Sequence, residues 1–285
     1  MRGWWDGVLT ASLAAGLTIA CGCSGASAQD HTQEHARILP ACGGDTIANA
    51  VVSRVIDGRT FVLNDGREVR LAAIEVPPLP LPQETDAAPG GAAARDALAA
   101  LLGNGAVTLK QAEPQKTDRY GRLVAYAFAA AADGEHLVQA DLLAAGQARV
   151  AAHVTSHACA MELLGREKTA RRAKLGLWAN SYYDMLNADN PTAVLAEQGH
   201  FALVEGNVLS VRESGATIYV NFGRRWTEDF TVTILKRNER NFTAAGFELK
   251  KLAGRHVRVR GWIEERGGPW IEATRPEQIE LADRE

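Results

Sequence analysis

The pattern of apolar and polar positions changes from one segment of the chain to the next. Between residues 48 and 75 apolar and polar side chains alternate, and an Asp-Gly pair interrupts the alternation twice. A period of two with Asp-Gly turns is typical of antiparallel strands joined by tight turns. The pattern therefore predicts three consecutive strands, at about 48–56, 59–64 and 67–75.

The next elements complete a first domain. Residues 77–91 contain five prolines and predict a loop, because proline cannot donate to a strand ladder. Three strands, a helix and two strands are the order of a five-stranded Greek-key barrel, the OB-fold. The elements expected after the loop are helices at 92–103, 136–146 and 159–178 and strands at 106–112 and 122–130.

The third of these helices carries a candidate buried face. We expect its apolar stripe at Met161, Leu164 and Lys168 or Ala170, with a basic side exposed to solvent. This helix closes the first domain, which the sequence places at 48–178.

A similar order of elements returns in the last third of the chain. Residues 179–199 are polar and show little periodicity, so they predict a linker. The fold class expected is mainly β with helices, an OB barrel followed by a second, small OB-like barrel at 200–285. The predicted elements of the second barrel are strands at 201–214, 216–223, 229–235, 255–265 and 269–274 and a helix at 239–252.

The first 28 residues have the pattern of an export signal. A charged start is followed by a short apolar run and by Ala26-Ser27-Ala28, a site of the A-x-A kind. The run is too short for a membrane anchor. We therefore expect a periplasmic or secreted protein with a polar tether at 29–47. Lipidation at Cys21 or Cys23 is less favoured, because the usual leucine three residues before Cys21 is absent.

The cysteines, the histidines and the net charge limit the kinds of bond and binding site that the chain can form. Removal of the signal leaves Cys42 and Cys159, which oxidising conditions favour as a disulfide, although two separate buried thiols remain the alternative. The histidines are scattered and no C-x-x-C occurs, so no zinc site is predicted. A formal net charge of -3 means that any binding of nucleic acid must come from a local patch.

Four motifs occur in a fixed order within the first domain. They are VIDGRTFVL at 55–63, VRLAAIEVPP at 69–78, TDRYGRLVAY at 117–126 and GLW at 176–178. Together they resemble the staphylococcal nuclease (thermonuclease) family over residues 50–178. The resemblance implies an OB barrel and a calcium-dependent nuclease site that hydrolyses phosphodiester bonds of DNA or RNA.

The resemblance also implies a phosphate-binding pair. Arg70 and Arg122 match the two arginines that hold the scissile phosphate in that family, and Tyr120 matches a tyrosine beside the substrate. A guanidinium suits this role because its planar fork donates two hydrogen bonds and stays charged, and it stabilises charge that develops in the transition state. The alternative is ordinary surface ion pairing of these arginines with Asp118 and Glu68.

Other positions depart from the family pattern. Arg59 replaces a carboxylate that binds calcium in the family, Glu75 replaces an aspartate, Val76 a threonine and Pro78 the general-base glutamate. With Asp57 these positions are remnants of a metal site at best, because calcium takes six to eight oxygen ligands. Pro78 has no group that can deprotonate water. We therefore expect no cofactor, with calcium bound only if this degenerate site still holds it.

Three functions remain open. The leading one is an exported module that binds nucleic acid or another phosphate-bearing ligand, or acts as a scaffold, with impaired or lost hydrolysis. The second is an active secreted nuclease in which Glu84 or Asp86 replaces the base. The third is a structural envelope protein without a ligand. Protein partners are not predicted.

Aromatic and basic residues alternate in the second barrel. Such barrels bind single strands by stacking bases on aromatic rings along a cationic groove. Alternatively, the rings belong to the core and Arg258 and Arg260 form the solvent-exposed side of a strand. Glutamates at 264, 265 and 272 favour this structural interpretation. The residues concerned are Tyr219, Phe222, Trp226, Phe230, Trp262, Trp270, Arg224, Arg225, Arg258, Arg260 and Arg266.

Overall fold

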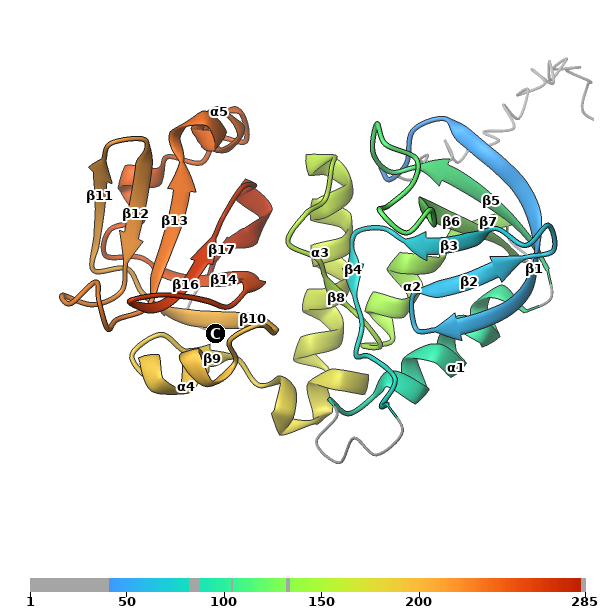
Figure 1. Ribbon diagram of the computed structural model, residues 1–285, viewed down its shortest axis with the longest axis horizontal. Helices are drawn as coiled ribbons and strands as arrows, with labels where there is room; N and C mark the ends of the chain where they lie inside the picture. The colour runs from blue at the N-terminus through green and yellow to red at the C-terminus, as the bar shows by residue number, and fades with distance from the viewer. Residues whose placement is uncertain (1–40, 82–87, 104, 132–133, 283–285) are drawn as a thin grey trace, which may run out of the picture. The chain divides into compact units, whose positions relative to one another are not determined.

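The computed structural model in Figure 1 describes residues 41–81, 88–103, 105–131 and 134–282. The expected signal peptide, most of the expected tether, and Cys21 and Cys23 lie outside these residues. All of the described residues belong to one compact unit. Within the described residues, no helix is long and apolar enough to cross a membrane.

The first domain is a closed five-stranded barrel. Strand β1 pairs with β2 and β5, β5 pairs with β6, β2 pairs with β3, and the parallel pair β3–β6 closes the ring (Figure 1). This arrangement confirms the OB-fold expectation. The elements are β1 (Thr46–Asp57), β2 (Thr60–Leu63), β3 (Glu68–Leu71), β4 (Ile74–Glu75), α1 (Gly91–Leu102), β5 (Ala106–Gln111), β6 (Leu123–Ala131), β7 (Gly134–Leu137), α2 (Val138–Ala144), β8 (Arg149–Val150) and α3 (His157–Arg172).

Helix α3 buries Leu164 and Ala170 as expected, but the rest of its buried stripe differs from the prediction. Met161 is 55% exposed, so its assignment to the buried face was wrong. The stripe follows helical spacing one position earlier and includes the carboxylate of Glu167, which is fully buried. Ser156 caps the helix by accepting from the backbone N–H of Cys159. The buried residues are Cys159, Ala160, Leu163, Leu164, Glu167 and Ala170.

The predicted disulfide is present. Cys42 and Cys159 are bonded, with their α-carbons 4.6 Å apart and both residues buried. The bond joins the segment that precedes β1 to the first turn of α3. It therefore fixes the start of the barrel to the helix that ends the domain.

The segment between the domains has more structure than a linker. Strand β9 pairs with β10 in parallel, and Asn190 caps α4 by accepting from the backbone N–H of Ala193. Trp178 and Tyr183 are buried. Its elements are two 3₁₀ helices, η1 (Gly176–Ala179) and η2 (Ser181–Tyr183), then β9 (Leu186–Asn187) and α4 (Pro191–Ala196).

The second domain is a further β domain with its own core. Strands β10 and β14 pair in one sheet, and a second sheet has the order β11-β12-β13-β16-β15. The parallel pair β13–β16 repeats the parallel pair β3–β6 of the first barrel. That this domain is OB-like stays a prediction. Its elements are β10 (Phe201–Asn207), β11 (Ser210–Ser214), β12 (Thr217–Asn221), β13 (Thr231–Leu235), α5 (Lys236–Ala244), η3 (Leu249–Leu252), β14 (His256–Trp262), β15 (Glu264–Arg266), β16 (Gly268–Glu272), η4 (Pro276–Gln278) and β17 (Ile279–Leu281).

Candidate phosphate-binding site

Arg70 lies on the strand that connects the two halves of the first barrel's ring. It is on β3, opposite Thr60 of β2 and Val124 of β6. The side chain is half-buried, and among the described residues no hydrogen-bond or ion-pair partner contacts it; Glu68 is not a partner. Burial and the positive charge of Arg59 lower the pKa of Arg70, and the carboxylates of Glu75 and Asp118 oppose this shift only in part. Arg70 is therefore a cation without a counterion at this point of the barrel.

Arg59 lies beside Arg70 and is already paired. Its Nη1 contacts Oε2 of Glu75, and both side chains are largely shielded from solvent. The turn that carries Arg59 is fixed by two hydrogen bonds, because Arg59 N–H donates to Asp57 Oδ1 and Leu71 N–H donates to Arg59 O, each at 2.8 Å. A Cβ at Gly58 would come within 2.6 Å of the Cβ of Ala94 on α1. The turn is thus held tightly against that helix.

Arg122 is the third arginine and lies directly before β6. Its Nε donates to Asp118 Oδ2 at 2.8 Å and its Nη2 lies 2.7 Å from the same oxygen. Asp118 Oδ1 accepts the backbone N–H groups of Tyr120 and Arg122, which fixes the turn. Burial opposes ionisation of Asp118, but the hydrogen bonds from Arg122 and Tyr120 outweigh it and lower the pKa of Asp118. The structure therefore contains the Asp118 pairing that the sequence left as an alternative.

Tyr120 extends from the same turn towards solvent. It is 66% exposed, and the guanidinium groups of Arg119 and Arg122 lie 4.8 and 5.1 Å from its ring centroid. Arg119 Nη2 also donates to the Tyr120 hydroxyl at 2.7 Å. Stacked guanidinium and phenol groups of this kind give an exposed planar surface next to the arginine pair.

The residues present do not fit a calcium ion. The guanidinium of Arg59 forms an ion pair with Glu75, so a cation already contacts the carboxylate that a metal would need as a ligand. Among the described residues, no group of three or more His, Cys, Asp or Glu side chains is arranged to hold a metal. The described residues therefore do not bring six to eight oxygens together at short range.

The backbone of Pro78, at the position of the expected base, is closely packed against α1. A Cβ at Gly91, the first residue of α1, would come within 2.1 Å of the carbonyl oxygen of Pro78. The proline backbone thus packs directly on the start of the helix and presents no acid. Glu84 and Asp86, the alternative bases, lie outside the described residues.

Arg149 is a cation that the sequence did not single out. It lies on β8, next to Glu75 in the ladder β4–β8. Its Nη1 donates to the carbonyl of Phe201 at 2.9 Å, while its Nε is buried and has no partner within the described structure. Burial lowers the pKa of Arg149. Arg149, Arg59 and Glu75 line one cavity of about 590 Å³. A lone arginine in a short strand gives no sequence signal of such burial.

The comparison with protein families identifies the first domain. Residues 68–180 match the sequence model described as staphylococcal nuclease homologue. The first domain is thus similar to the staphylococcal nuclease homologue family over residues 68–180. The match includes Arg70, Glu75, Tyr120 and Arg122 and ends just after η1; it begins after Arg59. A comparison with curated proteins gives no match to the chain.

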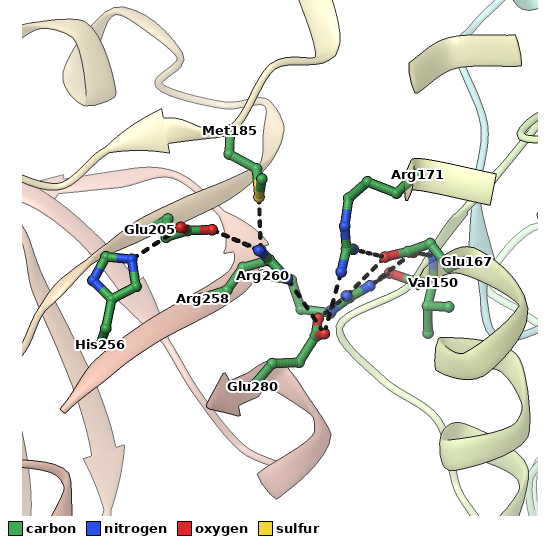
Figure 2. Close-up of polar contacts among 9 residues, drawn as sticks. All are labelled: Val150, Glu167, Arg171, Met185, Glu205, His256, Arg258, Arg260 and Glu280. Carbon is green, nitrogen blue, oxygen red and sulfur yellow. Dashed lines mark hydrogen bonds and ion pairs between the residues drawn. The ribbon is translucent and has the colours of Figure 1, made fainter. Parts of the chain in front are cut away.

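The arginines of β14 in the second domain are not on a solvent-exposed face, so that expectation was wrong. Arg258 is 6% exposed and Arg260 is 1% exposed. Each has a carboxylate partner: Arg258 Nη2 lies 2.7 Å from Glu205 Oε2, and Arg260 contacts Glu167 and Glu280 (Figure 2). Burial is possible because β14 lies between β10 and β17 and its guanidinium groups meet acidic residues there.

The aromatic residues of the second domain divide into two groups. Phe222, Phe230 and Trp270 are buried, as the structural interpretation expected. Trp226 and Trp262 are 69% and 48% exposed. The exposed rings are therefore available for contacts that the buried rings cannot make.

Proposed function

We propose that the staphylococcal nuclease homologue domain binds phosphate groups of nucleic acid through Arg70, with little or no calcium-dependent hydrolysis. The observation that carries the proposal is the state of Arg70. It is a half-buried guanidinium without a partner, and it lies between two arginines that already have carboxylates. Removing such a cation from water is costly unless an anion compensates it.

A phosphate group fits the donors that remain. Arg122 engages Asp118 through Nε and Nη2, and Arg59 engages Glu75 through Nη1. All N–H groups of Arg70 remain for a phosphate, which accepts two parallel hydrogen bonds from one guanidinium. The exposed ring of Tyr120 lies beside Arg122 and suits a sugar or base attached to that phosphate.

The same residues argue against efficient cleavage. Arg59 neutralises the carboxylate Glu75, and Pro78 has no acid-base group. General-base catalysis requires a titratable group within hydrogen-bond reach of the attacking water. The disulfide between Cys42 and Cys159 fits export to an oxidising compartment, periplasmic or extracellular.

Binding and cleavage are separated by one experiment on the purified chain. Fluorescein-labelled oligonucleotides of DNA and RNA are titrated by anisotropy at several salt concentrations, and the same samples are run on gels with calcium or a chelator. We expect binding that weakens steeply with salt, because it depends on phosphate contacts, and no calcium-dependent products.

A matched pair of variants tests the site. Arg70→Ala is expected to weaken binding about tenfold, by the loss of one charged bidentate contact. Arg54→Ala, at an exposed arginine on β1, is the control and is expected to change nothing. Equal affinity of Arg70→Ala and wild type would reject the site. Calcium-dependent products that disappear in Arg122→Ala would establish the active nuclease instead, and absence of any binding would favour the structural role.

A further inference from the structure

The second domain carries a groove that is separate from the arginine site of the first barrel. It has a volume of about 770 Å³ and lies along β11, β12 and the loop after β12. Most of its residues on the two strands share one face, because Arg212 is directly opposite Tyr219 and Ser210 is opposite Asn221 in the ladder, whereas Glu213 is opposite Ile218. The apolar side chains Val220 and Ile218 point to the core on the other face.

Cations and rings alternate along this groove. Arg212 and Arg224 line it, are exposed, and have no carboxylate partner in the described part of the chain. Tyr219 is half-buried, and Trp226 is 69% exposed. A single exposed apolar side chain is ordinary on a surface, so Trp226 is informative here only because it lines the same groove as two arginines that are unpaired in the described structure.

The carboxylates near the groove do not cancel its charge. Glu213 lines it, but its carboxylate is shared by Lys236 and Lys250 at 3.1 and 3.2 Å. The glutamates at 264, 265 and 272, which favoured the structural interpretation, lie on β15 and β16. These strands are at the opposite edge of the sheet β11-β12-β13-β16-β15. Strand order therefore separates these glutamates from the two strands of the groove, although the turn between β15 and β16 packs against Thr227 and Glu228 of the loop after β12.

We propose that this groove binds single-stranded nucleic acid, with bases stacked on Trp226 and Tyr219 and phosphates held by Arg212 and Arg224. A cationic groove with exposed rings suits a single strand, because every unpaired base offers a face for stacking. A duplex keeps its bases stacked inside and offers only its backbone. The inference uses no residue of the first barrel and stands independently of the function proposed there.

The test uses the full mature chain and a labelled thymidine 12-mer, single-stranded or annealed to its complement. We expect tighter binding of the single strand. Trp226→Ala is expected to weaken its binding about tenfold, as for loss of one stacked base, and Trp226→Phe to retain most of it. Arg212→Ala with Arg224→Ala is expected to weaken binding and to reduce the salt slope by roughly 0.7 for each lost contact.

The control is Arg225→Ala, in the same loop, because Arg225 is already paired with Glu228 at 2.8 Å and exposed. Thermal melts establish that each variant is folded. If the groove variants and wild type bind the single strand equally, or wild type binds no single strand at low salt, the proposal is overturned. Loss of binding in Arg70→Ala alone would overturn it and leave the first site standing; loss in the groove variants alone would support it and reject the first site.

Discussion

Arg260 on β14 forms a bidentate ion pair with Glu167 on α3. Its Nη1 lies 2.9 Å from Oε2 and its Nη2 lies 2.9 Å from Oε1, and neither side chain is more than 1% exposed (Figure 2). Glu167 Oε2 also accepts the backbone N–H of Val150 at 2.5 Å, and Glu167 Oε1 contacts Arg171 at 3.0 Å. The carboxylate of Glu167, in the nuclease-like domain, therefore forms an ion pair with Arg260 of the second domain.

Removal of this carboxylate is expected to destabilise the protein strongly. In Glu167→Ala, Arg260 keeps Glu280 as its only carboxylate and the Val150 carbonyl as an acceptor, and the N–H of Val150 loses its own acceptor. Breaking a buried pair by removing one partner lowers the free energy of unfolding by about 3–5 kcal/mol. Chemical denaturation measures the change.

The exposed pair of Arg225 and Glu228 is the control, and Arg225→Ala is expected to lower the unfolding free energy by less than about 1 kcal/mol. The double variant Glu167→Leu with Arg260→Met leaves Arg171 and Glu280 facing each other at 3.6 Å. It is expected to recover part of the loss, because apolar replacement of a buried pair is often tolerated. Equal effects of Glu167→Ala and Arg225→Ala would contradict the importance of the buried pair.

Stability is expected to decrease in acid through Glu280. Burial opposes its ionisation, but Arg260 and Arg171 outweigh burial and lower the pKa of Glu280 in the folded chain. A carboxyl whose folded pKa is depressed stabilises above the unfolded value and loses this contribution as pH falls through the folded value. The free energy of unfolding should therefore be steady above about pH 5 and decrease below it.

Urea midpoints measured from pH 3 to pH 7 check this dependence. Glu280→Gln removes the titrating group and is expected to lower stability at neutral pH while flattening the acid limb. If the urea midpoint of the variant falls with pH as steeply as that of wild type, the acid effect belongs to other carboxylates. Glu205, which is paired with His256 and Arg258, is the next to test.

Reduction of the disulfide is expected to loosen the first barrel. Cys42 and Cys159 are 117 residues apart in sequence. In the chain-entropy model a loop of this length contributes about 4–5 kcal/mol to stability. Cys42→Ser with Cys159→Ser should show a lower denaturation midpoint, and wild type in reductant should match the variant. Two alkylated cysteines in unreduced, natively produced protein would show that the bond does not form.

The sequence predicted the barrel better than the contacts of its charged residues. Alternation and Asp-Gly turns fix strand positions locally, so β1, β2 and β3 lie within a few residues of their expected ranges. The partner of a buried charge depends on distant segments. Glu167 was missed because the helical stripe was placed on Met161, one position late; the stripe that starts at Ala160 includes Glu167, and a carboxylate within an apolar stripe is the available signal.

The arginine site shows the same limit. The sequence identified Arg59 as a lost metal ligand, but only the fold shows that its guanidinium contacts Glu75. The sequence also could not show whether Asp118 or Glu68 pairs with the arginines. In the structure, the turn around Gly121 places Asp118 in contact with Arg122. Local motifs thus located the site, and the tertiary structure determined which of its charges are compensated.

The contact between Arg59 and Glu75 predicts how calcium binding can be restored. Arg59→Asp removes the cation, frees Glu75 and adds a second carboxylate near Asp57, so hard oxygen ligands come together. Wild type is expected to show no shift in melting temperature with millimolar calcium, whereas the variant should be stabilised by calcium but not by equal ionic strength of sodium. Arg59→Ala is the control, because it frees Glu75 without adding a ligand.

Adding Val76→Thr and Pro78→Glu to Arg59→Asp should then raise calcium-dependent cleavage of single-stranded DNA on gels. A calcium shift without any cleavage would mean that the backbone of Pro78, packed against Gly91, keeps the new glutamate away from the water. A calcium shift already present in wild type would show that Arg59 does not replace the metal.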